Sequence, residues 1–201
     1  MKANETRRHA RLAGLLLGIL AAPAIASNQA PVNDEALLPE SRHENIGELV
    51  TQFIQRSHYL RVSVDDDLSS RVMDRYIEAL DRNRMYLLQS DIDFFEQFRH
   101  SLDDVVRSKP LDPVYDMFSV YRSRVRERFE FALTQLENEP DFLVDEDYQF
   151  DRTEMPWAKT TAELDELWRK RVKNDALNLA LADKPWEESR EVLVKRYKRF
   201  L

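Results

Sequence analysis

The chain has 201 residues, of which 43% are hydrophobic and 33% are charged, so it can form one compact domain with its own core. Its formal net charge of -7 argues against nucleic acid as the main partner, because phosphate binding needs an excess of Lys and Arg. Since the sequence has no cysteine, disulfides, thiolate metal sites, a cysteine nucleophile and a lipoprotein anchor are excluded.

Residues 1–26 have the composition of a secretory signal peptide. Three arginines precede an apolar run at residues 12–22, and Ala-Ile-Ala at 24–26 fits a cleavage site. The alternative is a transmembrane anchor, but an anchor needs about 20 apolar residues and this run is shorter and contains glycine. We expect cleavage between Ala26 and Ser27, a periplasmic location, and no transmembrane segment in the mature chain.

The segment 27–43 is polar, has two prolines and shows no period, so it is predicted to be a flexible lead-in. Helical periodicity begins after it. The first predicted helix runs from about Glu44 to His58, and its apolar face carries Ile46, Leu49, Val50 and Phe53.

Two helices are predicted between residues 63 and 105. Ser63 and Asp66 fit a capping box at the start of the second helix, and Ser90 with Asp93 does the same for the third. The apolar stripe of the second helix contains Leu68, Val72, Tyr76 and Leu80. The stripe of the third, read as one continuous helix, contains Ile92, Phe95, Phe98, Leu102 and Val105.

The fourth helix has the clearest pattern. Asp112 is a good N-cap, Pro113 fits the first helical position, and Asn138 and Pro140 end the helix. Its apolar face contains Val114, Met117, Phe118, Tyr121, Val125, Phe129, Ala132 and Leu136.

Residues 141–159 break the helical period and are predicted to form an ordered irregular segment that packs its aromatic residues, Phe142, Tyr148, Phe150 and Trp157. A fifth helix follows the capping box of Thr160 and Glu163, and a sixth starts at Pro185. Only Gly47 lies beyond residue 18, which disfavours hairpins and tight turns. The sequence therefore predicts an all-α irregular bundle of about six helices with no sheet.

The last predicted helix stops on Phe200 and Leu201 without a capping residue or a polar tail. This ending favours a domain truncated at its C-terminal end, in which Tyr197, Phe200 and Leu201 would be exposed. The alternative is a terminal helix that is docked by its last residues.

The polar residues offer no recognisable reaction chemistry. The histidines at positions 9, 43, 58 and 100 include no pair four residues apart, and Asp145-x-Asp147-x-Gln149 fails as a calcium loop because Phe150 and Pro156 replace its Gly and Glu. Residues 65–67, all Asp, suit a helix N-terminus. We predict no catalytic, cofactor-binding or metal-ligating residues.

Four alternating arginines, at positions 122, 124, 126 and 128, form the other notable cluster. On a helix they divide between the two edges of the apolar stripe. We interpret them as side chains whose stems cover the buried face while their charged ends reach water. The alternative is that a partner protein binds them.

A set of short motifs occurs in order along residues 44–201. The motifs are residues 51–59 (TQFIQRSHY), 74–76 with 80–81, 87–91, 115–116, 128–133 (RFEFAL), 141–142, 148–152 with 156–157, 163–168 and 196–198. None is diagnostic alone, but the ordered set resembles the N-terminal helical domain of the tail-specific protease (carboxy-terminal processing serine peptidase) family.

The resemblance implies a periplasmic peptidase that degrades or trims proteins from their C-termini. In that family a Ser/Lys dyad cleaves the substrate, a PDZ domain holds its C-terminus, and the helical domain helps to enclose it and offers a surface to adaptor proteins. The dyad and the PDZ domain lie downstream of the matching region, so no residue here inherits a catalytic role. The chain is thus expected to be inactive alone, with protein substrates, the remaining peptidase domains and an adaptor as its partners.

Two functions remain open at this point. The first is a non-catalytic scaffold within a tail-specific peptidase, which predicts coding sequence beyond Leu201. The second is a stand-alone helical binding module that keeps the docking surface.

Overall fold

The computed structural model describes residues 37–57, 63–108 and 111–201. The predicted signal peptide, its cleavage site, most of the lead-in and His58 lie outside the described residues. Expectations about those segments stay predictions.

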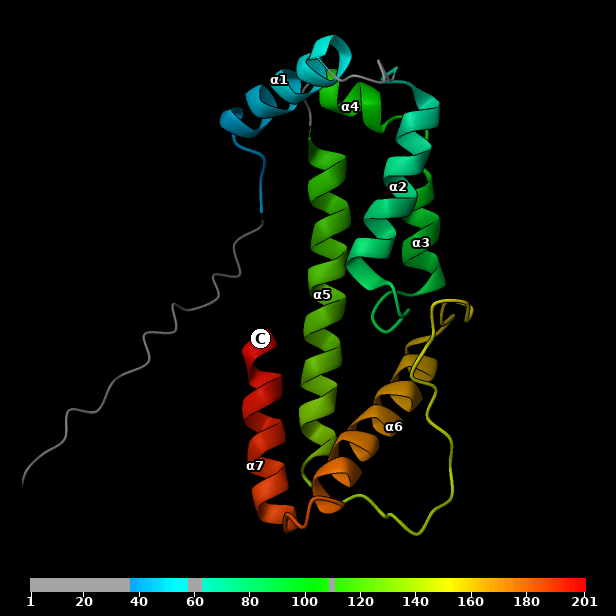
Figure 1. The fold of residues 1–201 in the computed structure, drawn as a ribbon, viewed down its shortest axis with the longest axis vertical. Coiled ribbons are helices and arrows are strands. Elements are labelled where there is room, and N and C mark those ends of the chain that lie inside the picture. Colours follow the sequence, from blue (N-terminus) through cyan, green and yellow to red (C-terminus); the bar gives the residue numbers. More distant parts are fainter. Residues whose placement is uncertain (1–36, 58–62, 109–110) are drawn as a thin grey trace, which may run out of the picture. The chain divides into compact units, whose positions relative to one another are not determined.

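The described part of the chain is entirely helical apart from its loops (Figure 1). Its only β-type pairing is an isolated bridge between Leu88 and Ala158. The prediction of an all-α fold without a sheet is therefore confirmed, with seven α-helices in these residues instead of about six. The elements are α1 (Ser41–Ser57), α2 (Asp66–Asp81), α3 (Gln89–Glu96), α4 (Leu102–Ser108), α5 (Asp112–Gln135), α6 (Thr161–Ala180), α7 (Trp186–Tyr197) and a 3-10 turn (Lys198–Phe200).

The predicted third helix is two helices, because the chain turns between Glu96 and Leu102. The N–H of Leu102 donates to the hydroxyl of Ser69 on α2, at 2.8 Å, instead of continuing a helical ladder. Both Phe95 and Leu102 are buried in the same core cluster. Periodicity missed this break because the apolar spacing continues through the turn.

Helix starts depend on capping groups that periodicity places only approximately. The N-cap of α2 is Asp65 and not the predicted Ser63. The Asp65 side chain accepts the Leu68 N–H. At α3 the N-cap is Leu88, whose N–H donates to the Asp91 carboxylate at 2.9 Å, so the predicted pair Ser90 and Asp93 lies two residues too late.

Three further helix starts lie within a few residues of their predicted positions. The N-cap of α5 is Leu111, and α1 begins at Ser41, three residues before the predicted start. At α6 the predicted N-cap is confirmed, because Thr160 accepts the Glu163 N–H at 3.2 Å, whereas the Glu163 carboxylate accepts the N–H of Lys159 at 2.8 Å and not that of Thr160.

One core lies where α5, α6 and α7 meet. Trp168 is fully buried there, with its ring 5.1 Å from Phe129 in an edge-to-face arrangement. Its indole N–H donates to the Met85 carbonyl at 2.6 Å, which ties α6 to the loop after α2. The buried members of this cluster are Met85, Phe129, Ala132, Leu136, Trp168, Val172, Ala176, Leu193 and Tyr197.

A second core joins α2, α3 and α4 to the first half of α5. Its buried members are Met73, Leu87, Ile92, Phe95, Leu102 and Met117. Because α5 supplies Met117 to this cluster and Phe129 to the first, one helix runs through both cores.

The turn after α2 is organised by one carboxylate. Asp81 is buried and accepts the N–H groups of Met85, Tyr86 and Leu87 at 2.8–2.9 Å. Burial raises the pKa of Asp81, while these N–H groups and nearby Arg152 act in the opposite direction. The Asp81 side chain thus accepts the hydrogen bonds of backbone N–H groups that have no helical partner in this turn.

The irregular segment 141–159 is confirmed as non-helical. Phe142 packs against the α5–α6–α7 core and Trp157 against the other core. The prediction was wrong for Phe150, which is exposed and contacts only the edge of Tyr148 among the aromatic rings of the described residues.

The end of the described chain is docked more closely than expected. Tyr197 is buried, and its hydroxyl donates to Asp175 at 2.7 Å. The ring of Phe200 stacks on Phe129 with centroids 4.4 Å apart, although 58% of the residue stays exposed. The expectation of an exposed Tyr197 was therefore wrong, because the last turn folds onto α5 and α6.

No helix in the described residues is long and apolar enough to cross a membrane.

Candidate functional site

The histidines do not meet in the described structure. His43 lies in the first turn of α1, where its Nδ1 accepts the Glu40 N–H at 3.1 Å and lies 2.7 Å from the Tyr115 hydroxyl. The two rings are stacked, with centroids 6.0 Å apart. His100 is exposed in the turn between α3 and α4, not on a helix as predicted. His43 therefore connects α1 to α5.

The acidic motifs also have local structural roles. Asp65 caps α2, while Asp66 and Asp67 lie in its first turn. Asp145 and Asp147 are exposed, and within the described residues no three His, Asp or Glu side chains are grouped closely enough to hold a metal ion.

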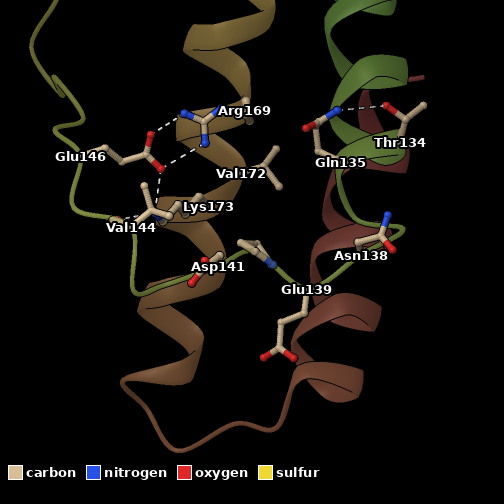
Figure 2. Close-up of a pocket in the computed structure, with 11 residues that line it drawn as sticks. Thr134, Gln135, Asn138, Glu139, Asp141, Val144, Glu146, Arg169, Val172 and Lys173 are labelled. Carbon is tan, nitrogen blue, oxygen red and sulfur yellow. Dashed lines mark hydrogen bonds and ion pairs between the residues drawn. The ribbon is translucent and has the colours of Figure 1, made fainter.

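A hollow of about 400 Å³ lies between the end of α5, the segment after it and α6 (Figure 2). Figure 2 shows Glu146 extending from the irregular segment toward Arg169 and Lys173 of α6. Arg169 donates to both Glu146 oxygens, and Lys173 donates to Glu146 and to the Val144 carbonyl, each at 2.7 Å. These contacts fasten the irregular segment to α6.

The two cations of this hollow are paired with Glu146. Hydrogen bonds from Arg169 and Lys173 lower the pKa of Glu146 to about 2. Hydrogen bonds to Glu166 and then to Glu146 raise the pKa of Arg169, so Arg169 and Glu146 both stay charged near neutral pH. The hollow is open, and Glu146 engages its cations, so the contacts in it act as a structural junction.

A second hollow of about 400 Å³ lies between α2, α3 and residues 153–157. Arg99 connects its walls by donating to Asp74 and Ser70 of α2, at 2.8 and 3.0 Å, as well as to Glu96. The guanidinium of Arg84 lies 5.2 Å from the Trp157 ring centre. Cation–carboxylate and cation–ring contacts again hold neighbouring segments together.

Two of the four arginines on α5, Arg124 and Arg128, pair with carboxylates of different helices. Arg124 forms a bidentate pair with Asp91 at 2.8 and 3.1 Å and thereby joins α5 to the start of α3. Arg128 is buried and donates to Asp165 of α6. The prediction that these side chains reach water was wrong for Arg128, because Asp165 lies within reach across the helix interface.

The most unusual surface lies on α1. Its predicted apolar face is exposed: Ile46 retains 55% of its accessible area, Leu49 65% and Phe53 66%, and Val50 is exposed as well. The side of α1 that faces the domain instead carries Gly47 and the buried Thr51, whose hydroxyl donates to the Gly47 carbonyl at 2.9 Å. Sequence reasoning identified the face but could not show that it points outward.

The ion pairs between segments could not be predicted from the sequence. Glu146, Asp91 and Asp165 lie in a chain rich in carboxylates, so no spacing distinguishes them from their exposed neighbours. Their partners are 23 to 37 residues away in sequence, a separation that carries no periodic signal.

Comparison with known proteins gives two findings. Residues 50–201 match the family described as the tail specific protease N-terminal domain. A tail-specific protease from Haemophilus influenzae is 39% identical over 148 residues, which cover 73% of this chain and 21% of that protein. The chain therefore spans about a fifth of the length of this curated relative.

Proposed function

Because the chain belongs to the tail-specific protease N-terminal domain family, we propose that it forms the non-catalytic N-terminal scaffold of a periplasmic C-terminal-processing serine peptidase. In this role the helical domain helps to enclose protein substrates, while cleavage takes place in another part of the polypeptide. The observation that carries the proposal is the match to an N-terminal domain together with a relative of which only 21% is covered.

The architecture supports a scaffold. The prominent polar groups join segments to one another: Arg124 joins α5 to α3, Arg128 joins α5 to α6, and Glu146 joins the irregular segment to α6. Such pairs, with two continuous cores, keep a surface in a fixed position.

The periplasmic location is part of the proposal and depends on residues 1–26, whose basic start, apolar run and Ala-Ile-Ala motif are typical of a secretory signal peptide. An N-terminal sequence of the exported protein beginning at Ser27 would support it. A product that keeps its first 26 residues would contradict it.

A second candidate function is a stand-alone binding module that docks an adaptor protein in the periplasm. The observation that favours it is the exposed apolar face of α1, because large apolar patches on soluble proteins are often interaction sites. In this case the chain would work without any peptidase domain attached to it.

The first experiment is to determine the reading frame downstream of the Leu201 codon and to express its whole product. We expect the whole product to degrade an unfolded, fluorescently labelled protein, and the 201-residue chain alone to leave it intact. Cleavage by the chain alone would contradict a non-catalytic scaffold. A stop codon directly after Leu201 would favour the stand-alone module.

A further inference from the structure

The attachment of α1 to the domain uses small and polar groups. A Cβ added to Gly47 would lie 3.4 Å from the Val106 side chain of α4, which shows how closely the two helices approach. Thr51 is buried on the same side, and His43 contacts Tyr115 of α5. The large apolar residues of α1 other than Ile54 therefore contribute little to its packing.

These outward residues form a regular line. We define the α1 seam as Arg42, Ile46, Leu49, Phe53 and Arg56, which follow one another at spacings of four, three, four and three residues. This spacing keeps the five side chains on one side of a helix and is the pattern by which two helices pack along each other. The seam thus has an apolar centre and a cation at each end, of which Arg42 pairs with the exposed Glu40 at 3.0 Å.

The charges of the seam argue against a second copy of the same surface as its partner. In an antiparallel pair centred on Leu49, Arg42 of one copy would face Arg56 of the other, and in a parallel pair each arginine would face its equivalent. Both arrangements bring like charges together, which is destabilising. A complementary partner has an apolar stripe with a carboxylate near each end.

We propose that the α1 seam is an intramolecular docking surface, covered by an amphipathic segment with acidic ends from the part of the peptidase that lies outside the matched domain. This inference depends on the proposed function. It is supported by the length of the relative, of which about four-fifths lies outside the matched region, and by the exposure of the seam when residues 37–201 are taken alone.

The test is site-specific photo-crosslinking in the whole product of the reading frame. Phe53→p-benzoylphenylalanine replaces the aromatic residue of the seam with a photoreactive one of similar shape. The matched control is Gln55→p-benzoylphenylalanine, because Gln55 is exposed on another side of the same helix. After irradiation, crosslinked peptides are identified by mass spectrometry.

We expect Phe53 to crosslink within one polypeptide to residues beyond Leu201, with at least tenfold less product from the Gln55 control. Crosslinks between two copies, to lipid, to another protein or to residues 37–201, or no crosslink at all, would each overturn the proposal.

A charge-reversed variant, Arg42→Glu with Arg56→Glu, tests the chemistry of the partner. We expect it to reduce the Phe53 crosslink severalfold while the circular dichroism of the protein is unchanged. An unchanged crosslink yield would contradict acidic ends on the partner. If the whole product degrades protein but the crosslink is missing, only the docking proposal fails; if no coding sequence follows Leu201, the proposed function fails.

Discussion

Helices α1 and α6 are both amphipathic, yet they use their apolar faces in opposite ways. Helix α6 buries Leu164, Trp168 and Val172 in the domain, whereas α1 leaves Ile46, Leu49 and Phe53 exposed. The side of α1 that faces the domain carries instead Gly47 near Val106, the buried Thr51, the half-buried Ile54, and His43 in contact with Tyr115. An apolar stripe thus identifies a helix that needs a partner, but the partner can lie outside the domain.

The two helices are therefore expected to differ in what their apolar residues contribute: those of α6 to the stability of the domain, and those of α1 to binding. Substitutions on the α6 side should destabilise the domain, because they remove buried contacts. Substitutions on the α1 seam should leave the domain folded and act on docking. The following predictions test this division on the isolated chain.

The largest effect is expected for Trp168→Ala. It removes a fully buried side chain, its contact with Phe129 and its hydrogen bond to Met85. Truncating a buried aromatic residue costs about 3–5 kcal/mol, which we expect as a loss in the free energy of unfolding measured with urea. Trp168→Phe is the control and should lose less. A loss below 1 kcal/mol for the alanine variant would contradict the central place of Trp168.

Tyr197→Phe is expected to have an intermediate effect. It removes the hydroxyl that donates to Asp175 and should cost about 1–3 kcal/mol. Burial, with the charge of Asp175, raises the pKa of Tyr197, so this residue stabilises the fold below the ordinary tyrosine pKa and stops doing so as the pH rises above it. The loss of stability at alkaline pH should therefore be smaller in the variant. Equal alkaline profiles would show that Tyr197 is not coupled to folding.

Glu146→Gln is expected to have a smaller, pH-dependent effect. The pKa of Glu146 is lowered to about 2 in the folded chain, so its contribution is present above its ordinary value of 4.5 and is lost as the pH falls toward 2. At pH 7 we expect a loss of roughly 1 kcal/mol or less, because the pairs lie near the surface. The difference from the unsubstituted chain should decrease as the pH is lowered from 5 to 3; a constant difference would contradict the ion pair.

The smallest effect is expected for Phe53→Gln. The side chain is 66% exposed, and substitutions at such positions usually change the free energy of unfolding by less than about 0.5 kcal/mol. Urea unfolding of the isolated chain checks this value. A loss above 2 kcal/mol would show that the α1 seam is part of the domain core and would remove the contrast between the two helices.

The sequence predicted the helical class well, because apolar spacing and the scarcity of glycine are properties of the chain itself. The Thr160 N-cap and the irregular segment after Pro140 are likewise local signals. The α3–α4 break was missed because it depends on Ser69, a residue of another helix that accepts the Leu102 N–H.

The surfaces were less predictable than the elements. The pattern of α1 shows which residues share a face, but only the close approach of Gly47 to Val106 reveals that the opposite face is turned inward. The sequence pattern predicted that the Arg128 side chain reaches solvent, because its partner, Asp165, is 37 residues away in the chain. Such pairings follow from tertiary structure, which single-sequence patterns do not contain.

The hydrogen bond from Trp168 to Met85 has a consequence for the order of folding. It joins residues 83 positions apart, so during synthesis the loop after α2 leaves the ribosome long before its partner exists. Closing so long a loop is entropically costly, and contacts of this kind slow folding. We expect the α5–α6–α7 core, which buries Trp168, to form first and the α2–α3 region to join it last, so during refolding the burial of Trp168 should precede formation of the α2–α3 core.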